Sequence, residues 1–234
     1  MFLLLPGAIF LMGLPGGGKD TQAFRFIKQF PNWVHVDTGG EIYRRITDPA
    51  FAEDTYVKQQ IALYNAGALN DPLWVTKLIA ERIQFYASQE KGIIFSGSPR
   101  TLYEAQNLSL VLEKAFGHRQ ILILEVAVLE ETARKRSLDR ITCGDKLCRY
   151  TTTKDMLGLP CPNCKRTFLK EDQKDDEWKV KELPKRFEEF YARTVPALKF
   201  MEERFTNSWV DGNLSMDAVE AQIYVVAARL LCHT

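Results

Sequence analysis

The chain has 234 residues, of which 46% are hydrophobic and 26% charged, and its formal net charge is +1. This length and composition are typical of one globular domain, or of one domain with inserted lobes, and they allow a sizeable buried core. A net charge so close to zero provides no general basic field for nucleic acid. We therefore expect no nucleic-acid partner.

The apolar start of the chain is not typical of a secretion signal. Residues 1–13 carry no basic segment and no small-residue cleavage site, and Pro6 interrupts the apolar run. No apolar run in the sequence approaches the roughly 20 residues that a membrane-spanning helix needs. We expect a cytoplasmic monomer without a membrane partner.

Short apolar runs alternate with helical patterns along the chain. The predicted strands are 8–13, 33–39, 92–100, 120–126 and 208–212. The predicted helices are 21–30, 41–46, 51–67, 71–89, 131–141, 183–205 and 216–231, and the helix at 183–205 is kinked or broken near Pro196. This alternation predicts an α/β fold, in which a parallel sheet is covered by helices on both faces.

The strongest local signal is the loop after the first predicted strand. Gly13-Leu-Pro-Gly-Gly-Gly18-Lys19 fits G-x-x-x-x-G-K and lies between a strand and a helix, which is the context that this motif requires. Backbone N–H groups can hold a polyphosphate there, and the lysine can reach its outer phosphates. The predicted phosphate-binding residues are Gly13, Gly16, Gly17, Gly18, Lys19, Asp20 and Thr21. The alternative is a glycine-rich turn beside an exposed lysine.

This loop and five later segments resemble the adenylate kinases and related nucleoside monophosphate kinases. GLPGGGKDTQ is similar to the family's G-x-P-G-x-G-K-G-T-Q, and DTGGEIYRR, NAGALNDPL, SGSPRT, RKRSLDRI and VDG resemble later family motifs in the same order. The resemblance covers essentially the whole chain. It implies a P-loop core formed by residues 1–37, 71–141 and 184–234. It also implies two inserted lobes, a monophosphate-binding lobe at 38–70 and a Cys-rich lid at 142–183.

The resemblance also implies roles for individual side chains. Thr38 and Arg44 would hold the acceptor nucleotide, and Arg100 would bind its phosphate. The transferring phosphoryl group would be surrounded by Arg136, Arg140 and Arg186, with Lys19 as a further catalytic residue. Phosphoryl transfer depends mainly on positioning and positive charge, which arginine supplies well. Any one of these arginines, taken alone, could instead be a solvated surface charge.

Four of the five cysteines cluster, as Cys143-x4-Cys148 and Cys161-x2-Cys164. Two such pairs can close a tetrahedral thiolate site, and four thiolates leave no open position for catalysis. The cluster stands where some members of the family carry a zinc-binding lid, so we expect structural Zn²⁺ in a zinc-ribbon-like lobe. Metal-free thiols or disulfides are the alternative. The family's lid arginine would be replaced here by Lys170 or Lys174.

Several departures from the family pattern bear on function. Asp20 stands where the family has Gly, and Ser96 where the family has the Asp that helps to hold magnesium through water. We therefore expect Asp20 to act as the carboxylate on the magnesium side, and a solvent-facing helix-capping Asp is the alternative. Glu104 replaces the Gln that contacts the acceptor base. Because an ionised Glu only accepts hydrogen bonds, AMP is the first expectation and GMP or CMP stays open.

The expected activity is reversible phosphoryl transfer from ATP–Mg²⁺ to a nucleoside monophosphate, foremost AMP (ATP + AMP = 2 ADP). A catalytically inactive nucleotide-sensing protein is the first alternative, since two positions near the metal differ from the family. Lys19 and the five arginines speak against it. A zinc-ribbon protein that binds nucleic acid is the second alternative, and the acidic residues within 171–177 speak against that one.

Overall fold

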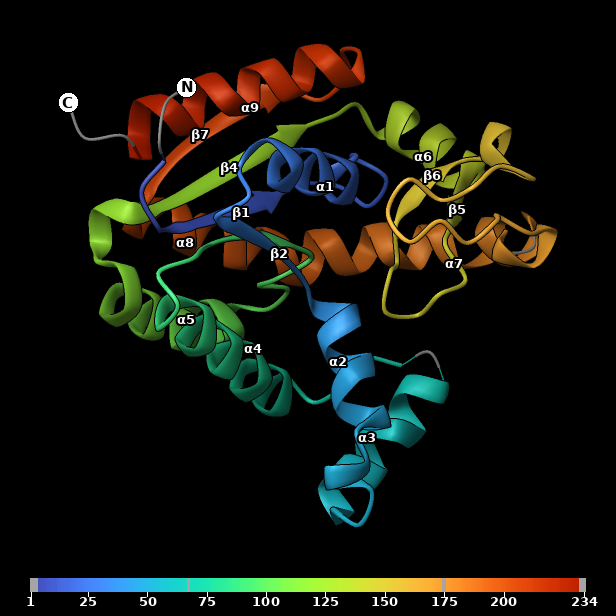
Figure 1. The fold of residues 1–234 in the computed structure, drawn as a ribbon, viewed down its shortest axis with the longest axis horizontal. Helices are drawn as coiled ribbons and strands as arrows, with labels where there is room; N and C mark the ends of the chain where they lie inside the picture. The colour runs from blue at the N-terminus through green and yellow to red at the C-terminus, as the bar shows by residue number, and fades with distance from the viewer. Residues whose placement is uncertain (1–3, 67, 174–175, 232–234) are drawn as a thin grey trace.

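The computed structural model describes residues 4–66, 68–173 and 176–231, and its centre is a five-stranded parallel sheet (Figure 1). The strands run in the order β2–β3–β1–β4–β7. Their bounds are β1 Ala8–Met12, β2 Trp33–Asp37, β3 Gly92–Ser96, β4 Ile121–Ala127 and β7 Thr206–Asp211. The predicted α/β fold is confirmed, as are five strands at the expected places.

Helices cover both faces of this sheet because strand residues alternate between the two faces. Ile9 and Leu11 of β1 pack in a cluster with α1 (Lys19–Gln29) and α9 (Met216–Leu231). Ala8, Phe10 and Met12 pack in the opposite cluster, together with α4 (Pro72–Ala87), α5 (Leu102–Phe116) and α8 (Val195–Arg204). The apolar core therefore fixes the five strands, and all of their carboxyl ends lie along one edge.

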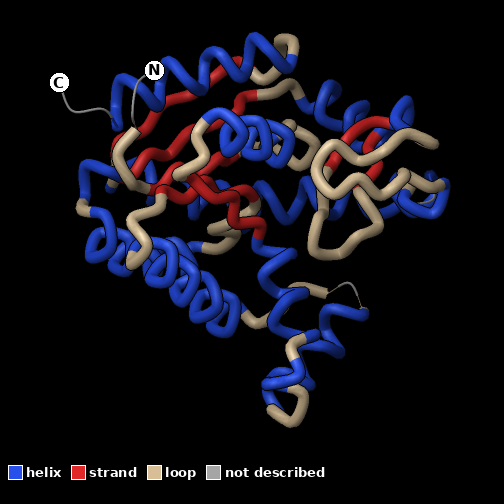
Figure 2. Tube along the Cα trace, viewed as in Figure 1, coloured by secondary structure: helices blue, strands red, loops and turns tan. Residues whose placement is uncertain are grey.

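Two lobes project from this core on the side where those strand ends lie (Figures 1 and 2). One contains α2 (Thr38–Thr47), a 3-10 turn (Pro49–Phe51) and α3 (Thr55–Asn65). The other contains the antiparallel pair β5 (Arg140–Thr142) and β6 (Thr151–Thr153), followed by the short 3-10 turns Lys154–Met156 and Lys170–Asp172. It lies between α6 (Glu130–Asp139) and α7 (Asp176–Glu189) in the chain.

Several predicted boundaries differ from the structure. The strand predicted at 33–39 ends at Asp37, because the Asp37 carboxylate accepts from the backbone N–H groups of Gly39 and Gly40 and so starts α2. The helix predicted at 131–141 ends at Asp139, and Arg140 is the first residue of β5. The helix predicted at 51–67 is shorter, because α3 starts at Thr55 after a separate 3-10 turn, and Gly67 lies outside the described residues. The strand predicted at 92–100 ends at Ser96, and the helix predicted from 183 starts earlier, at Asp176.

One helix was not predicted. α5 begins at the N-cap residue Thr101, whose hydroxyl accepts from the backbone N–H of Glu104 and donates to the Glu104 carboxylate. The T-x-x-E spacing was a readable signal for this helix start. The interruption expected near Pro196 is a π-helical turn, Phe190–Thr194, between α7 and α8.

Candidate functional site

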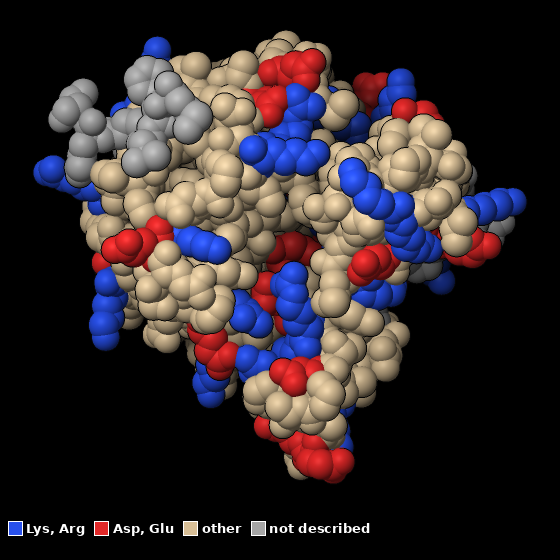
Figure 3. Space-filling view, in the orientation of Figure 1, with Lys and Arg blue, Asp and Glu red and all other residues tan. Residues whose placement is uncertain are grey.

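A cavity of about 780 Å³ lies at the carboxyl ends of the strands, between the core and the two lobes. Ligands of open parallel sheets bind at this edge. Most predicted site residues line the cavity: Gly13, Gly16, Gly17, Gly18, Lys19, Asp20, Thr21, Arg44, Arg100, Arg136, Arg140 and Arg186. Figure 3 shows Lys and Arg side chains gathered in a hollow of the surface between the lobes, with acidic groups beside them.

The phosphate loop joins β1 to α1 and depends on its glycines. Gly16 has φ 85°, and a Cβ there would overlap the Ala133 carbonyl oxygen and the Ser137 hydroxyl of α6. Gly18 caps α1 in the left-handed conformation without a side chain of its own. The N-terminus of α1 therefore points its N–H groups into the cavity, where an anion can bind.

Lys19 is folded back onto the loop. Its Nζ donates to the carbonyl oxygens of Gly13 and Leu14, both at 2.7 Å. Burial lowers the pKa of Lys19 to about 8, against the attraction of Asp20, and the nearby arginines lower it further. The site therefore holds a cation that gains from meeting a phosphate.

Three arginines from separate elements act on one another electrostatically in this site. Burial, with repulsion from Arg140 and Arg100, lowers the pKa of Arg186 to about 10. Arg100 is anchored by a 2.8 Å hydrogen bond from its Nε to the Gly97 carbonyl. Such repulsion is tolerated where an anionic ligand offsets it, which favours a polyphosphate ligand.

Two other arginines line the cavity, and their guanidinium groups already bind protein acceptors. Arg136 donates to the Gly212 carbonyl oxygen at 2.7 Å, at the end of β7. Arg44 pairs with Glu41 on the same face of α2. Both could move onto a ligand only by exchanging these partners.

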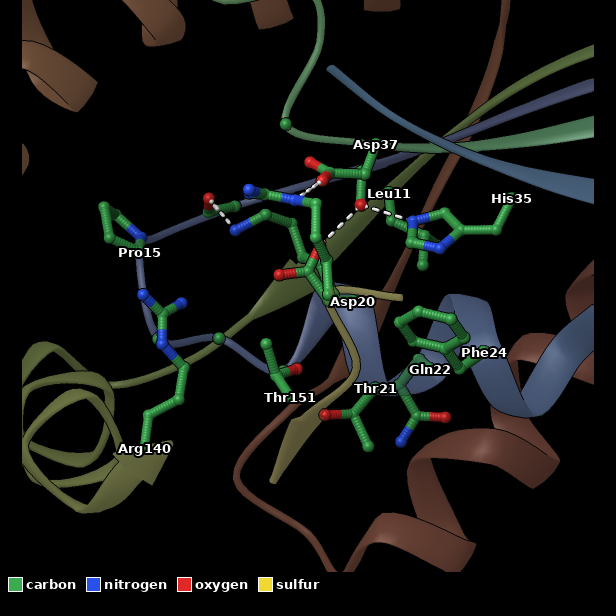
Figure 4. A pocket seen from close by; sticks show the side chains of 18 of the residues that line it. Leu11, Pro15, Asp20, Thr21, Gln22, Phe24, His35, Asp37, Arg140 and Thr151 are labelled. Carbon is green, nitrogen blue, oxygen red and sulfur yellow. Dashed lines mark hydrogen bonds and ion pairs between the residues drawn. The ribbon is translucent and has the colours of Figure 1, made fainter. Parts of the chain in front are cut away.

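Asp20 lies inside a short hydrogen-bonded chain. The Ser96 hydroxyl donates to Asp20 Oδ1 at 2.5 Å, and His35 Nε2 lies 2.6 Å from the same hydroxyl (Figure 4). Burial opposes ionisation of Asp20, but His35, the hydrogen bond from Ser96 and the cations Arg140 and Lys19 together hold its pKa below the ordinary value. Asp20 is therefore an ionised carboxylate at the cavity wall.

Two predicted site residues do not line the cavity. Thr38 is buried, and its hydroxyl donates to the Gly97 carbonyl at 3.4 Å. Glu104 is also buried, and its carboxylate accepts from the Thr101 hydroxyl at 3.1 Å and from the backbone N–H of Arg100 at 3.0 Å. Burial raises the pKa of Glu104. Both side chains thus have structural contacts, and in this arrangement neither faces a ligand in the cavity.

Arg149 was missed by the sequence analysis, although it lines the cavity from the Cys-rich lobe. Its guanidinium pairs with Asp37 at the start of α2. It also covers the backbone of Gly39, where an added Cβ would lie 2.7 Å from a guanidinium nitrogen. No local pattern marks this arginine, because its partner is 112 positions away in the sequence.

The four clustered cysteines meet in space. Their sulfurs all lie within 4.8 Å of one another, with 3.6 Å between Cys143 and Cys164 and 3.7 Å between Cys148 and Cys161. A metal with four thiolate ligands at about 2.3 Å would place its sulfurs about 3.8 Å apart. The wider first pair is closed by Asp145, whose carboxylate accepts from the backbone N–H of Cys148 at 3.1 Å. The cluster therefore fits a tetrahedral metal ion.

A family model described as adenylate kinase matches residues 11–206. The chain belongs to the adenylate kinase family. An adenylate kinase of Novosphingobium aromaticivorans is 30% identical over 222 residues, which cover 94% of this chain and 98% of that protein. The adenylate kinase of Zymomonas mobilis is 31% identical over 222 residues, which cover 92% of this chain and 93% of that protein. The adenylate kinase of Caldanaerobacter subterraneus is 28% identical over 218 residues, which cover 90% of this chain and 91% of that protein.

Membership of the adenylate kinase family makes this protein a nucleoside monophosphate kinase, a phosphotransferase that acts on nucleotides. Adenylate kinases use Mg²⁺ with ATP, which agrees with a phosphate loop and converging cations. Among the described residues, each helix is too short or too polar to cross a membrane.

Proposed function

We propose that this adenylate kinase family member transfers the γ-phosphoryl group of ATP–Mg²⁺ reversibly to AMP. The observation that carries the proposal is the convergence of Lys19, Arg100, Arg140 and Arg186 on one cavity at the N-terminus of α1. The relatives reported above are named adenylate kinases, which favours AMP over other acceptors.

In this proposal the chain contributes binding and charge. The loop and Lys19 hold the donor phosphates, Arg44 and Arg100 hold the acceptor, and Arg136, Arg140 and Arg186 stabilise the charge that spreads over the transferring group. Lobes at 38–70 and 142–183 would close over the substrates and exclude water. Thr38 would support the acceptor side through its contact with Gly97.

The lid cation is Arg149 in this proposal. Lys170 is exposed and does not line the cavity, and Lys174 lies outside the described residues. Arg149 instead reaches the cavity wall, and it offers a planar guanidinium that can bind a phosphate at two oxygens. It would exchange Asp37 for a substrate phosphate when the lobes close.

Asp20 is the proposed carboxylate on the magnesium side. It is ionised and at the cavity wall, and magnesium binds through one or two carboxylates together with phosphates and water. The bound ion would neutralise charge on the donor phosphates. Magnesium titrations of activity test this, because Asp20→Asn should raise the magnesium concentration needed for half-maximal activity. An unchanged requirement would refute the role of Asp20.

Structural Zn²⁺ is proposed for the four-cysteine cluster. The sulfur spacing fits, and zinc would stabilise a lobe whose own buried cluster is small. Elemental analysis should find about one zinc per chain. We also propose a cytoplasmic location, since the four clustered cysteines form no disulfide and a reducing compartment keeps thiols in that state. We propose in addition that the protein is a monomer. Light scattering would test the monomer.

The acceptor is tested by measuring ADP formation from ATP with AMP, GMP, CMP or UMP. The proposal expects the highest kcat/KM with AMP. Preference for GMP or CMP would correct the acceptor but keep the reaction, and nucleotide binding without turnover would favour the inactive-sensor alternative. Glu104 as a base contact stays a prediction. In Glu104→Gln one amide oxygen replaces the two carboxylate oxygens that accept from Thr101 and from the Arg100 N–H, so thermal unfolding is measured beside the acceptor assay. A changed acceptor preference with unchanged stability would report contact with the base.

A further inference from the structure

The first turn of α1 packs on polar residues of β2 and β3 beside the phosphate loop. His35 and Ser96 lie on the sheet face that α1 covers, the same face as Trp33 and Ile94, because each follows by two residues along its strand. Asp20 and Phe24 are four residues apart on α1 and so share one face. The Phe24 ring meets the His35 ring edge-on at 4.8 Å between centroids. The His35 ring is therefore held by packing against Phe24.

The direction of the hydrogen bonds in this chain follows from chemistry. The Ser96 hydroxyl donates its single proton to Asp20 Oδ1, at 2.5 Å. The contact of 2.6 Å between Ser96 Oγ and His35 then requires a proton on His35 Nε2. Ser96 is fully buried, so solvent does not replace either partner.

We propose that His35 is a positioning residue of this kinase: its Nε2–H orients the Ser96 hydroxyl, and this hydroxyl fixes the Asp20 carboxylate next to Lys19 in the phosphate loop. The chain runs from the sheet to the loop and ends at the cavity wall. Without it, the Asp20 side chain could rotate within the first turn of α1. The role of Asp20 toward magnesium rests on the proposed function, whereas its orientation by His35 does not.

The arrangement excludes another use of Ser96. Ser96 is not set up as a nucleophile, because its proton is directed at a carboxylate and its side chain is fully buried.

The tautomer of His35 gives a direct test that is independent of catalysis. Nitrogen NMR of the ¹⁵N-labelled protein near neutral pH should show His35 protonated at Nε2, with its signals assigned by their loss in His35→Gln. In Ser96→Ala the Nε2 signal should shift, while that of the surface residue His118 should not. A neutral His35 protonated at Nδ1 alone would overturn the proposal.

Kinetics with two matched variants then test the function of the chain. Gln carries an N–H donor at a similar reach to His Nε2, whereas Phe keeps the ring shape without a donor. We expect His35→Phe to lower kcat/KM by about threefold to tenfold, the loss of one buried hydrogen bond, and His35→Gln to recover most of this. His118→Phe should change nothing, and thermal unfolding would verify that all variants fold.

A double-mutant cycle separates this proposal from the magnesium role. If His35 acts through Asp20, the defect of His35→Phe should disappear in an Asp20→Asn background. An equal defect in both backgrounds, or a His35→Gln defect as large as that of His35→Phe, would overturn the positioning role. The cycle can show that the effects of His35→Phe and Asp20→Asn on kcat/KM are coupled while Asp20→Asn leaves the magnesium requirement unchanged. In that case the magnesium role of Asp20 fails and the positioning role of His35 stands.

Discussion

The phosphate loop and the Cys-rich lobe both contain left-handed backbone, yet only the lobe places residues other than glycine there. In the loop these positions are Gly13, Gly16 and Gly18. In the lobe they are Gly158 (φ 83°) and two residues with side chains, Arg149 (φ 49°) and Lys165 (φ 67°), each of these two directly after the second cysteine of a pair. A residue with a Cβ loses roughly 1–2 kcal/mol in this conformation, and glycine does not.

The difference shows what each region contributes to the site. The loop presents backbone N–H groups, so side chains are excluded, as the overlap expected at Gly16 illustrates. The lobe holds its left-handed residues by hairpin hydrogen bonds, Arg149 N–H to Asp145 at 3.1 Å and Lys165 N–H to Cys161 at 2.9 Å. There the conformation can carry a side chain, and at Arg149 that side chain reaches the cavity and Asp37.

The largest effect is expected at Lys19, whose ammonium group would hold the donor phosphates. Lys19→Met should lower kcat/KM about 10²–10³-fold, comparable with removing a donor that stabilises the transition state. Lys114→Met, an exposed lysine on α5, is the control and should leave kcat/KM within twofold. Steady-state kinetics measure kcat/KM of both variants. Equal values would show that Lys19 has no role in catalysis.

Gly16→Ala tests the claim that the loop excludes side chains. It combines a left-handed φ with overlap against α6, so the free energy of unfolding should fall by about 2–4 kcal/mol. Gly158→Ala has a similar φ of 83° but open space around its Cβ, and it should cost about 1 kcal/mol. Chemical denaturation compares the two variants. Equal losses would show that strain alone, without the overlap, sets the cost.

Arg149→Gly tests the claim that the lobe keeps its left-handed residue for the side chain. The variant relieves strain but removes the guanidinium, so KM for nucleotide should rise about tenfold, as for one lost charge-assisted contact. Lys165→Gly relieves the same strain without removing a cavity residue, and should raise stability slightly with unchanged KM. If the Arg149→Gly enzyme had a normal KM for nucleotide, Arg149 would have a structural role and no role in nucleotide binding.

The pH dependence of ATP binding tests the burial of Lys19. In the free protein its pKa is about 8, below the ordinary value, while bound phosphate favours the ammonium form. Affinity for ATP should therefore be constant below pH 8 and fall as pH rises through 8, approaching tenfold per pH unit above it, with proton uptake on binding. Calorimetry in buffers of different ionisation enthalpy measures this. Lys19→Arg should flatten the curve, and a flat wild-type curve would contradict the assignment.

The sequence sufficed for the sheet and the loop because both depend on local patterns. Alternating apolar runs predict the strands, and glycines followed by Lys19 predict the phosphate site. Glu104 was linked to base recognition by resemblance, which stays a prediction, and its bond with the N-cap residue Thr101 was already indicated by their spacing. Arg149, Asp37 and His35 could not be predicted, because their partners come from distant segments that meet only in the fold.

The most direct test of the account follows the phosphoryl group itself. ATP labelled at its γ-phosphate is incubated with AMP, Mg²⁺ and the protein, and the products are separated and counted. The account predicts that the label enters the β-position of ADP, with two ADP formed for each ATP consumed and no accumulation of inorganic phosphate. Label released as inorganic phosphate, or ATP left unchanged although both nucleotides bind, would contradict it.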